Sequence, residues 1–343
     1  MPPNRIRLAF IGCGRNAGGH GKRMAGIDAV DIVGLCDPSD KALKQFRTHV
    51  GGLDNTPSFE HHVDLLKAAP IDAVVISTPH MQHCDQIVDS LGCGAHVLCE
   101  KPLVLTCAEA HQVLEAEQHA RRHVMISYQR HLIGPYVYTR DALASGTLGH
   151  VRFVTCRVSQ NWIQLKDQIP TPWRLKPKLS GGGQLTDTGS HMLDCMLWLT
   201  DLSVDQVHAY QDNCGLDVDV QTAASCRFTT GALGTIAVLG DARGEGFTVY
   251  DDINIFAERG ELLVANNRVS RRNGDTDLKP VSPTCYPATV SPDQAFIELI
   301  AGQRKNNPAP SRYGKAMAQL AEGIYRSTQL GRPVKISELR SEQ

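Results

Sequence analysis

The stretch IRLAFIGCGRNA at residues 6–17 decides the fold. Residues 6–11 form an apolar run without alternation, as expected for a parallel strand buried on both faces. Gly12-Cys13-Gly14-Arg15-Asn16-Ala17 follows directly and has the form GxGxx[G/A]. The first glycine permits a tight turn, the second permits close approach of a ligand, and the small last residue lets a helix pack on the strand. The stretch therefore predicts a strand, a turn and a helix whose N-terminus faces an anion.

The same alternation of buried strand and helix continues through residue 127. Further apolar runs lie at 30–36, 72–77, 95–99 and 123–127. Helical segments are predicted between them at 20–29, 39–48, 61–68, 82–92 and 106–120. Strands alternating with helices over this length predict a doubly wound parallel sheet, an α/β fold, in a domain of residues 1–127.

The second part of the chain has a different pattern. Residues 151–159 (VRFVTCRVS) alternate apolar and polar, as in a strand with one solvated face. Similar runs lie at 204–213, 220–229, 232–239, 252–257 and 261–265, and helices are predicted at 136–145, Asp187–Leu199 and 312–330. We expect an α+β domain of residues 128–343 with an open, mainly antiparallel sheet. Its last helix is expected to pack back on the first domain.

Composition and charge give no support for nucleic acid or a membrane as a partner. The formal net charge is −1, which gives no electrostatic reason to expect nucleic acid or a membrane surface as a partner. No stretch approaches the roughly 20 apolar residues of a membrane span, and LAFI is too short for a signal peptide. We therefore expect a cytoplasmic protein. The 11 cysteines contain no CxxC pair, so we expect reduced thiols and no metal site.

Asp37 supports a dinucleotide site. It ends the second apolar run, 20 residues after Ala17, where an acid accepts hydrogen bonds from the adenosine ribose. A carboxylate there would repel a 2′-phosphate, so NAD is expected rather than NADP. The alternative is that Asp37-Pro38-Ser39 is only a turn or a helix cap. The combination predicts a Rossmann domain that binds NAD through Gly12, Gly14, Arg15, Asn16, Ala17 and Asp37.

Glu100-Lys101-Pro102 follows the fourth apolar run. This is the sheet edge where open α/β sheets bind ligands. A lysine there can hydrogen-bond a substrate oxygen and favour negative charge that develops on it. The alternative is an exposed lysine on a loop.

Asp187 and His191 are four residues apart, so on a helix they share a face, and Asp194 lies near the same face. A carboxylate beside an imidazole raises its basicity or fixes its tautomer, as a general base requires. By spacing alone, the three residues also fit a solvated stripe on a helix. The preceding glycines at 181–183 permit close approach of the backbone to a ligand, which favours the functional interpretation.

Several motifs point together to one family. They are the GxGxxA turn with Asp37, Thr78-Pro79 with His83, Glu100-Lys101-Pro102, Trp173-Arg174, GGGQLTDTGSHMLD at 181–194 and GIYRSTQLGRPVKI at 323–336. In this combination the chain resembles the Gfo/Idh/MocA family, named for glucose-fructose oxidoreductase, inositol dehydrogenase and a rhizopine-catabolism protein. The resemblance covers essentially the whole chain.

The resemblance implies a catalytic set of Lys101, Asp187 and His191. His191 would accept the proton of the substrate hydroxyl with support from Asp187, and Lys101 would orient the reacting oxygen. Thr78, Pro79, His83 and Glu100 would line the nicotinamide side of the cofactor site. Candidates for the substrate pocket are Tyr128, Arg130, Trp162, Trp173 and Arg174, with plain packing as the alternative for Tyr128 and the tryptophans.

Two departures from the family leave the substrate open. The chain reads Tyr128-Gln129-Arg130-His131 where many relatives carry an asparagine or arginine, and residues 160–172 suggest a pocket of their own shape. The resemblance implies an NAD(H)-dependent oxidoreductase acting on a small polyhydroxylated substrate, a sugar or cyclitol. The alternatives are an NAD-dependent glycoside hydrolase and a non-catalytic dinucleotide-binding regulator. The presence of Lys101, Asp187 and His191 together argues against the regulator.

The alternating strands also predict an assembly. Helices of the same domain can cover only one face of the expected sheet. Depending on register, Val154, Cys156, Ile236 and Val238 or their neighbours lie on the other face. Exposed apolar surface of this kind usually marks a subunit interface, and closed symmetric assemblies are the commonest result. Relatives also pair through this sheet. We expect a homodimer or homotetramer, the alternative being a polar face and a monomer.

Overall fold

The computed structural model describes residues 5–68, 70–164, 172–242 and 249–340. The chain divides into two compact units. The first unit contains Met1–Val104, Glu109–Tyr128 and Val290–Arg312, and the second contains Leu105–Ala108, Gln129–Thr289 and Tyr313–Gln343. Each unit has its own sheet.

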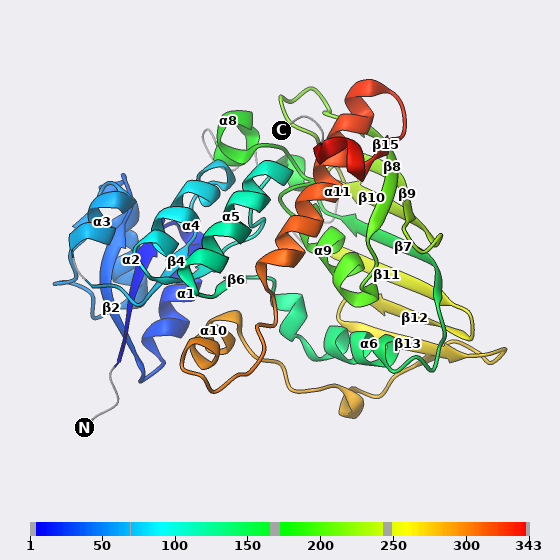
Figure 1. The fold of residues 1–343 in the computed structure, drawn as a ribbon, viewed down its shortest axis with the longest axis horizontal. Helices are drawn as coiled ribbons and strands as arrows, with labels where there is room; N and C mark the ends of the chain where they lie inside the picture. The colour runs from blue at the N-terminus through cyan, green and yellow to red at the C-terminus, as the bar shows by residue number, and fades with distance from the viewer. Residues whose placement is uncertain (1–4, 69, 165–171, 243–248, 341–343) are drawn as a thin grey trace. The chain divides into compact units, whose positions relative to one another are not determined.

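The described strands of the first unit form a six-stranded parallel sheet in the order β3-β2-β1-β4-β5-β6 (Figure 1). The strands are β1 (Ile6–Ile11), β2 (Val30–Cys36), β3 (Ser58–Phe59), β4 (Ala73–Ile76), β5 (His96–Cys99) and β6 (Val124–Ile126). This confirms the doubly wound sheet. The strand order reverses between β1 and β4, and ligands of such sheets bind at this switch point, beyond the carboxyl ends of the strands.

Helices accompany this sheet as α1 (Arg15–Ala25), α2 (Asp40–Val50), α3 (His62–Ala68), α4 (His83–Gly92), α5 (Cys107–Ala120) and α10 (Pro292–Ile300). The expected start of the first helix at residue 20 is wrong, because α1 begins at Arg15, directly after the glycine turn. Its interior glycines, which lower helix propensity, are explained by packing. A Cβ at Gly21 would lie 2.6 Å from Val50 and 2.7 Å from Phe46, so α1 and α2 approach closely.

The described strands of the second unit form a nine-stranded sheet in the order β14-β13-β12-β11-β7-β10-β9-β8-β15. The strands are β7 (Val151–Ser159), β8 (Val204–Asp212), β9 (Gln221–Phe228), β10 (Leu233–Leu239), β11 (Tyr250–Ala257), β12 (Gly260–Ala265), β13 (Arg268–Asn273), β14 (Lys279–Pro280) and β15 (Val334–Lys335). Apart from the parallel pair β7 and β10, the neighbouring strands run antiparallel. The expectation of an open, mainly antiparallel sheet is confirmed.

The second unit has its core between this sheet and its helices α6 (Gly134–Ala144), α9 (Gly189–Thr200) and α11 (Ser311–Leu330), with a short α8 (Pro177–Ser180) nearby in sequence (Figure 1). Met317, Leu320 and Ile324 of α11 belong to one buried cluster with strand residues such as Val154. From Tyr313 onward α11 is therefore part of the second unit, whereas the segment before it, with α10, belongs to the first.

The sheet of the second unit has one buried and one more exposed face. Val154, Cys156, Ile236 and Val238 are all at most 3% exposed, so these four residues point into the core. Their neighbours form the outer face. There Phe153 pairs with Phe256 at 6.5 Å between ring centroids, and Arg157 forms an ion pair of 2.7 Å with Asp252. Exposed apolar side chains are present at Leu233 (48%) and Tyr210 (70%). The outer face is therefore mixed rather than wholly polar.

The cysteines all lie in the described part of the chain, where none forms a disulfide and most are buried. In the same residues, each helix is too short or too polar to span a bilayer.

Candidate functional site

Gly12 makes the turn at the end of β1 possible. Its φ is +88°, and a Cβ there would lie 2.7 Å from the backbone of Ser77, which follows β4. The N–H of Gly12 donates to the carbonyl of Cys36 at the end of β2. The turn is thus held between the two neighbouring strands, and only glycine fits this position.

Gly14 is the N-cap of α1, and the space next to its Cα atom is open. A Cβ at Gly14 would meet no described atom within 4 Å, and Gly14, Arg15 and Asn16 are exposed while Ala17 is buried. No side chain caps the helix, and its first turn carries no acidic residue. The first N–H groups of a helix have no acceptor inside the helix, and its dipole favours an anion. The open space, the free helix end and the small Ala17 fit a diphosphate.

Asp37 faces the glycine turn. Its Oδ2 accepts a hydrogen bond from the N–H of Cys13 at 2.9 Å, and its Oδ1 accepts from the N–H of Ser39 at 2.9 Å. The capping role belongs to Ser39, whose hydroxyl accepts from the N–H of Ala42. Each carboxylate oxygen has two acceptor positions, so Asp37 keeps capacity for ribose hydroxyls. The carboxylate is held beside the turn where the NAD prediction requires it.

His83 ties together the loops after β4 and β5. The ring is fully buried, with Nδ1 2.8 Å from the carbonyl of Pro102 and Nε2 3.1 Å from the carbonyl of Thr78. Burial lowers the pKa of His83, and a neutral imidazole donates through only one of these nitrogens. The hydroxyl of Thr78 donates to Gln86. Thr78 and Pro79 remain partly exposed, so His83 fixes the loop that carries them.

Glu100 and Lys101 follow β5, and the Lys101–Pro102 peptide bond is cis. Glu100 Oε2 accepts a hydrogen bond from the backbone N–H of Lys101 at 3.2 Å. Its Oε1 lies 3.0 Å from Nε2 of His20, a residue of α1 that the motifs did not single out. Nδ1 of His20 lies 2.6 Å from Asp293 at the start of α10. No local pattern relates Asp293 to Glu100, so sequence reasoning missed this network.

Asp187 lies in the second unit, in the turn before α9. Its Oδ2 accepts hydrogen bonds from Trp162 Nε1 and from Arg174 Nε, both at 2.9 Å. Trp162 is 1% exposed, and the Arg174 guanidinium lies 4.5 Å from the centre of the Trp173 ring. Three residues expected in the substrate pocket are thereby gathered at Asp187, two of them as direct partners of its carboxylate.

His191 lies in the first turn of α9, which begins at Gly189 and not at Asp187 as expected. The argument that Asp187 and His191 share a helix face therefore fails. His191 is partly exposed, whereas the other residues from Gly189 to Leu199 are buried. A polar ring at the accessible position of a buried helix fits a chemical role better than a packing role.

Asp194 does not belong to a solvated stripe. It is 1% exposed, and its Oδ2 lies 2.7 Å from Nε2 of the buried His131. Burial raises the pKa of Asp194. The ring of His131 stacks on Trp198 at 4.2 Å between centroids, so this pair anchors α9 within the core.

The glycines at 181–183 are explained by the protein's own atoms. An added Cβ would lie 2.1 Å from Leu105 at Gly181, 2.2 Å from the Tyr325 hydroxyl at Gly182 and 1.9 Å from the Asp219 carbonyl at Gly183. Asp219 accepts hydrogen bonds from the N–H groups of Gly183 and Leu185 and from the hydroxyl of Tyr325. The glycines are therefore explained by close protein atoms, and the expected approach of a ligand at this turn stays a prediction. Asp219 and Tyr325, which shape this turn, were missed from the sequence.

Arg130 and Tyr128 are both enclosed. The Arg130 guanidinium is paired with Asp251 of β11, and its Nε donates to the hydroxyl of Tyr136 at 3.3 Å. Tyr128 is 1% exposed and belongs to the first unit. Of the segment 160–172, which we expected to shape the pocket, residues 165–171 lie outside the described residues.

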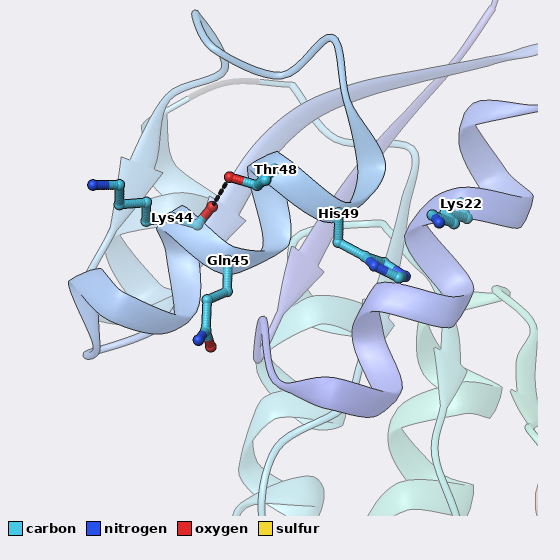
Figure 2. Close-up of a pocket in the computed structure, with 5 residues that line it drawn as sticks. All are labelled: Lys22, Lys44, Gln45, Thr48 and His49. Carbon is cyan, nitrogen blue, oxygen red and sulfur yellow. Dashed lines mark hydrogen bonds between the residues drawn. The ribbon is translucent and has the colours of Figure 1, made fainter.

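A cavity of about 530 Å³ lies between α1 and α2 and contains none of the predicted site residues. Figure 2 shows its lining residues, with Lys44 pointing away from Lys22; they are Lys22, Lys44, Gln45, Thr48 and His49. Since its lysines do not converge, we do not assign it to the cofactor. The expected catalytic set is divided between the units, with Lys101 in the first and Asp187 and His191 in the second.

Known proteins resemble both units. Residues 6–128 match the model of an oxidoreductase family with an NAD-binding Rossmann fold, and residues 136–263 match the GFO/IDH/MocA C-terminal domain. The rhizopine catabolism protein MocA of Rhizobium meliloti is 30% identical over 196 residues, which cover 57% of each chain. Myo-inositol 2-dehydrogenase of Thermotoga maritima is 24% identical over 77% of this chain and 76% of its own. The chain thus spans little more than half of the first relative's length.

A solved structure agrees with the fold over nearly the whole chain. Levoglucosan dehydrogenase, in complex with NADH and levoglucosan, superposes with a TM-score of 0.83 at 18% identity, covering 97% of this chain and 99% of the other. The two matched models belong to one family and together span both units. The chain therefore belongs to the GFO/IDH/MocA oxidoreductase family, and its first unit is the NAD-binding Rossmann fold of that family.

Proposed function

We propose that the protein is an NAD(H)-dependent oxidoreductase that transfers hydride between nicotinamide and a hydroxyl-bearing carbon of a sugar, cyclitol or sugar derivative. The observation that carries the proposal is the open glycine turn at Gly14 with the Asp37 carboxylate held beside it. Family membership supports the reaction class, and the polyhydroxylated substrate is the proposal's own extension.

The residues of the first unit would hold the cofactor. The turn at Gly12 and Gly14 and the first N–H groups of α1 suit the diphosphate, and Asp37 suits the adenosine ribose. When bound, NAD supplies the hydride acceptor. Thr78 and Pro79, held by His83, and Glu100 would border the nicotinamide end at the carboxyl edge of the sheet.

His191 would take the proton of the substrate hydroxyl. Its Nδ1 is buried, so Nε2 is the atom that we assign to proton transfer. Asp187 would support the protonated ring electrostatically. Because its Oδ2 already accepts from Trp162 and Arg174, the carboxylate is held in a fixed orientation. A positioned base of this kind contributes about 10²–10⁴-fold to a rate.

Lys101 would complete the set. Its ammonium group would hydrogen-bond the oxygen that loses its proton and favour the negative charge that develops there. Lys101 is 9% exposed, and a cation shielded from water interacts more strongly with such a charge. The substrate itself would contact Trp173 and Arg174, which are partly exposed beside Asp187.

Absorbance at 340 nm tests the proposal. A thermal-shift screen of polyols against the NAD-loaded protein first identifies a ligand, because binding stabilises the folded state. Accumulation of NADH with that ligand supports a dehydrogenase. Release of an aglycone from a glycoside without net NADH would instead identify an NAD-dependent hydrolase. Binding of NAD with neither reaction would indicate a regulator.

We also propose a homodimer or homotetramer through the outer face of the nine-stranded sheet. Support comes from the exposed Leu233 and Tyr210 and from the Phe153–Phe256 pair on that face. Apolar side chains at such a face are stabilised when a second copy covers them.

A further inference from the structure

His20 is a buried histidine between two carboxylates. Its side chain is 3% exposed, that of Asp293 is fully buried and that of Glu100 is 15% exposed. Nε2 lies 3.0 Å from Glu100 and Nδ1 lies 2.6 Å from Asp293. Arg23, one turn further along α1, pairs with the second oxygen of Asp293. The Arg23 Nη2 also lies 3.4 Å from Nδ1, but the shortest contact of each ring nitrogen is with a carboxylate oxygen.

The two short carboxylate contacts favour a doubly protonated ring. A carboxylate can only accept, and a neutral imidazole donates through one nitrogen, so two carboxylates are satisfied only by an imidazolium. Burial alone lowers the pKa of His20, but the hydrogen bonds and charges of Asp293 and Glu100 outweigh it and raise the pKa to about 9. The charged groups that face the ring are these two carboxylates and Arg23.

The network joins α10, α1 and the turn that follows β5. His20 lies in the second turn of α1, the helix that begins at the glycine turn. Glu100 follows β5 directly, and its other oxygen accepts from the backbone N–H of Lys101. The hydrogen bonds thus run from α10 through Asp293, His20 and Glu100 to the backbone of the lysine expected to contact the substrate.

We propose that His20 is a positioning residue that, as a buried imidazolium, orients Glu100 and so holds the Lys101 turn in place relative to the glycine turn. The role rests on the proposed function, because it acts through Lys101. Without the cation, the Glu100 carboxylate would lose its hydrogen bond to His20 and face a second carboxylate, Asp293, which only Arg23 would still pair, and this is unfavourable. Glu100 would then turn toward solvent and release the N–H of Lys101.

The test compares His20→Gln with His62→Gln. His62 is the matched control, because it also pairs with an aspartate in the first unit, Asp89 at 2.8 Å, but at the surface. Amide hydrogen exchange reports on the turn without any substrate. In His20→Gln the amide of Lys101 should exchange at least about tenfold faster, while that of Ser77, bonded to Ile11, stays protected. His62→Gln should change neither amide.

Turnover gives the second readout. In His20→Gln, kcat should fall about tenfold or more, while the Kd for NADH changes less than about threefold. Unchanged exchange at Lys101, or equal losses in kcat and NADH affinity, would overturn the proposal. If the wild-type protein oxidises no polyol, the proposed function fails, and hydrogen exchange still decides whether His20 orders the Lys101 turn.

Asp293→Asn keeps the inference testable if His20→Gln does not fold. The asparagine can still accept from Nδ1 but removes one negative charge, so the pKa of His20 falls. The ring then loses a proton at lower pH, and as pH rises it loses the positive charge that holds Glu100, together with one of its two N–H donors. The kcat of Asp293→Asn should decline between about pH 7 and 8, below the pKa of about 9 at which His20 of the wild type loses its charge. Identical pH profiles would refute the role of the charge.

Discussion

The two glycine-rich turns of the chain look alike in sequence and differ in structure. Both precede a helix, at Gly12–Gly14 before α1 and at Gly181–Gly183 before α9. At Gly14 an added Cβ would meet nothing described within 4 Å, whereas at each of residues 181–183 it would overlap protein atoms. Gly12 and residues 181–183 are thus explained by close protein atoms, whereas the space at Gly14 is left for the proposed cofactor. The sequence does not show this difference, because the atoms close to the second turn belong to distant residues such as Asp219 and Tyr325.

The largest expected effect is a loss of turnover when a residue of the proposed catalytic set is replaced. His191→Ala should lower kcat by about 10²–10⁴-fold because the proton acceptor is lost, and leave the Kd for NADH nearly unchanged. Lys101→Ala should also lower turnover. Steady-state kinetics and NADH fluorescence titration measure both quantities. Near-normal turnover of either variant would remove that residue from the mechanism.

A pair of alanine substitutions tests the comparison of the two turns directly. Gly183→Ala should lower the free energy of unfolding by about 3 kcal/mol, because its methyl group overlaps the Asp219 carbonyl. Gly14→Ala should change that free energy by less than about 0.5 kcal/mol and weaken NADH binding about tenfold, because its methyl group enters the ligand space. Denaturant unfolding and NADH titration report on both. Similar stability losses would contradict the distinction between filled and open turns.

A smaller effect on cofactor binding is expected from substitution of Asp37, whose carboxylate lies beside the first glycine turn. Asp37→Ala should weaken NAD binding about tenfold, as expected for loss of a hydrogen bond to a charged group, and weaken NADP binding less. Ser39→Ala is the control, since it removes the cap of α2 and about 1 kcal/mol of stability but no contact with a ribose. Titration of both cofactors decides the outcome. An unchanged NAD-to-NADP preference in Asp37→Ala would remove Asp37 from the cofactor site.

Most of the fold could be predicted because its signals are local. The buried strands of the first unit read as apolar runs, and β7 and its neighbours read as alternating runs. The start of α1 was missed because its glycines lower helix propensity, and close packing on α2 overrides that preference. The sequence of the segment that contains α10 does not indicate which of the two units it joins. It joins the first unit through contacts such as Asp293 with His20, which are 273 residues apart.

Part of the geometry of the candidate site could also be predicted. Gly14 and Asp37 have fixed spacing from a strand, and the structure brings Asp37 to the glycine turn as that spacing indicates. The partners of Asp187 were named for another role, because nothing local shows that the Trp162 and Arg174 N–H groups converge on one carboxylate oxygen. His20 was missed because a histidine inside a helix is unremarkable until its two acceptors are in place.

The two faces of the nine-stranded sheet also differ in exposure, because the inner face packs in the core and the outer face is more accessible to solvent. Leu233 is 48% exposed and Ile236, three residues later on β10, is 2% exposed. Ile236→Asp should unfold the protein, since it places an unpaired charge in the core. Leu233→Asp should change the free energy of unfolding of the subunit by less than about 0.5 kcal/mol, because water still solvates the new carboxylate.

Leu233→Asp should nevertheless weaken association of the subunits, since two copies of the charge meet in a symmetric interface. Light scattering at micromolar concentration measures this: the wild type should have at least twice the 37.5 kDa of one chain, and Leu233→Asp should approach that single mass. A wild-type mass near 37.5 kDa would show that the outer face stays open to water, as a monomer requires.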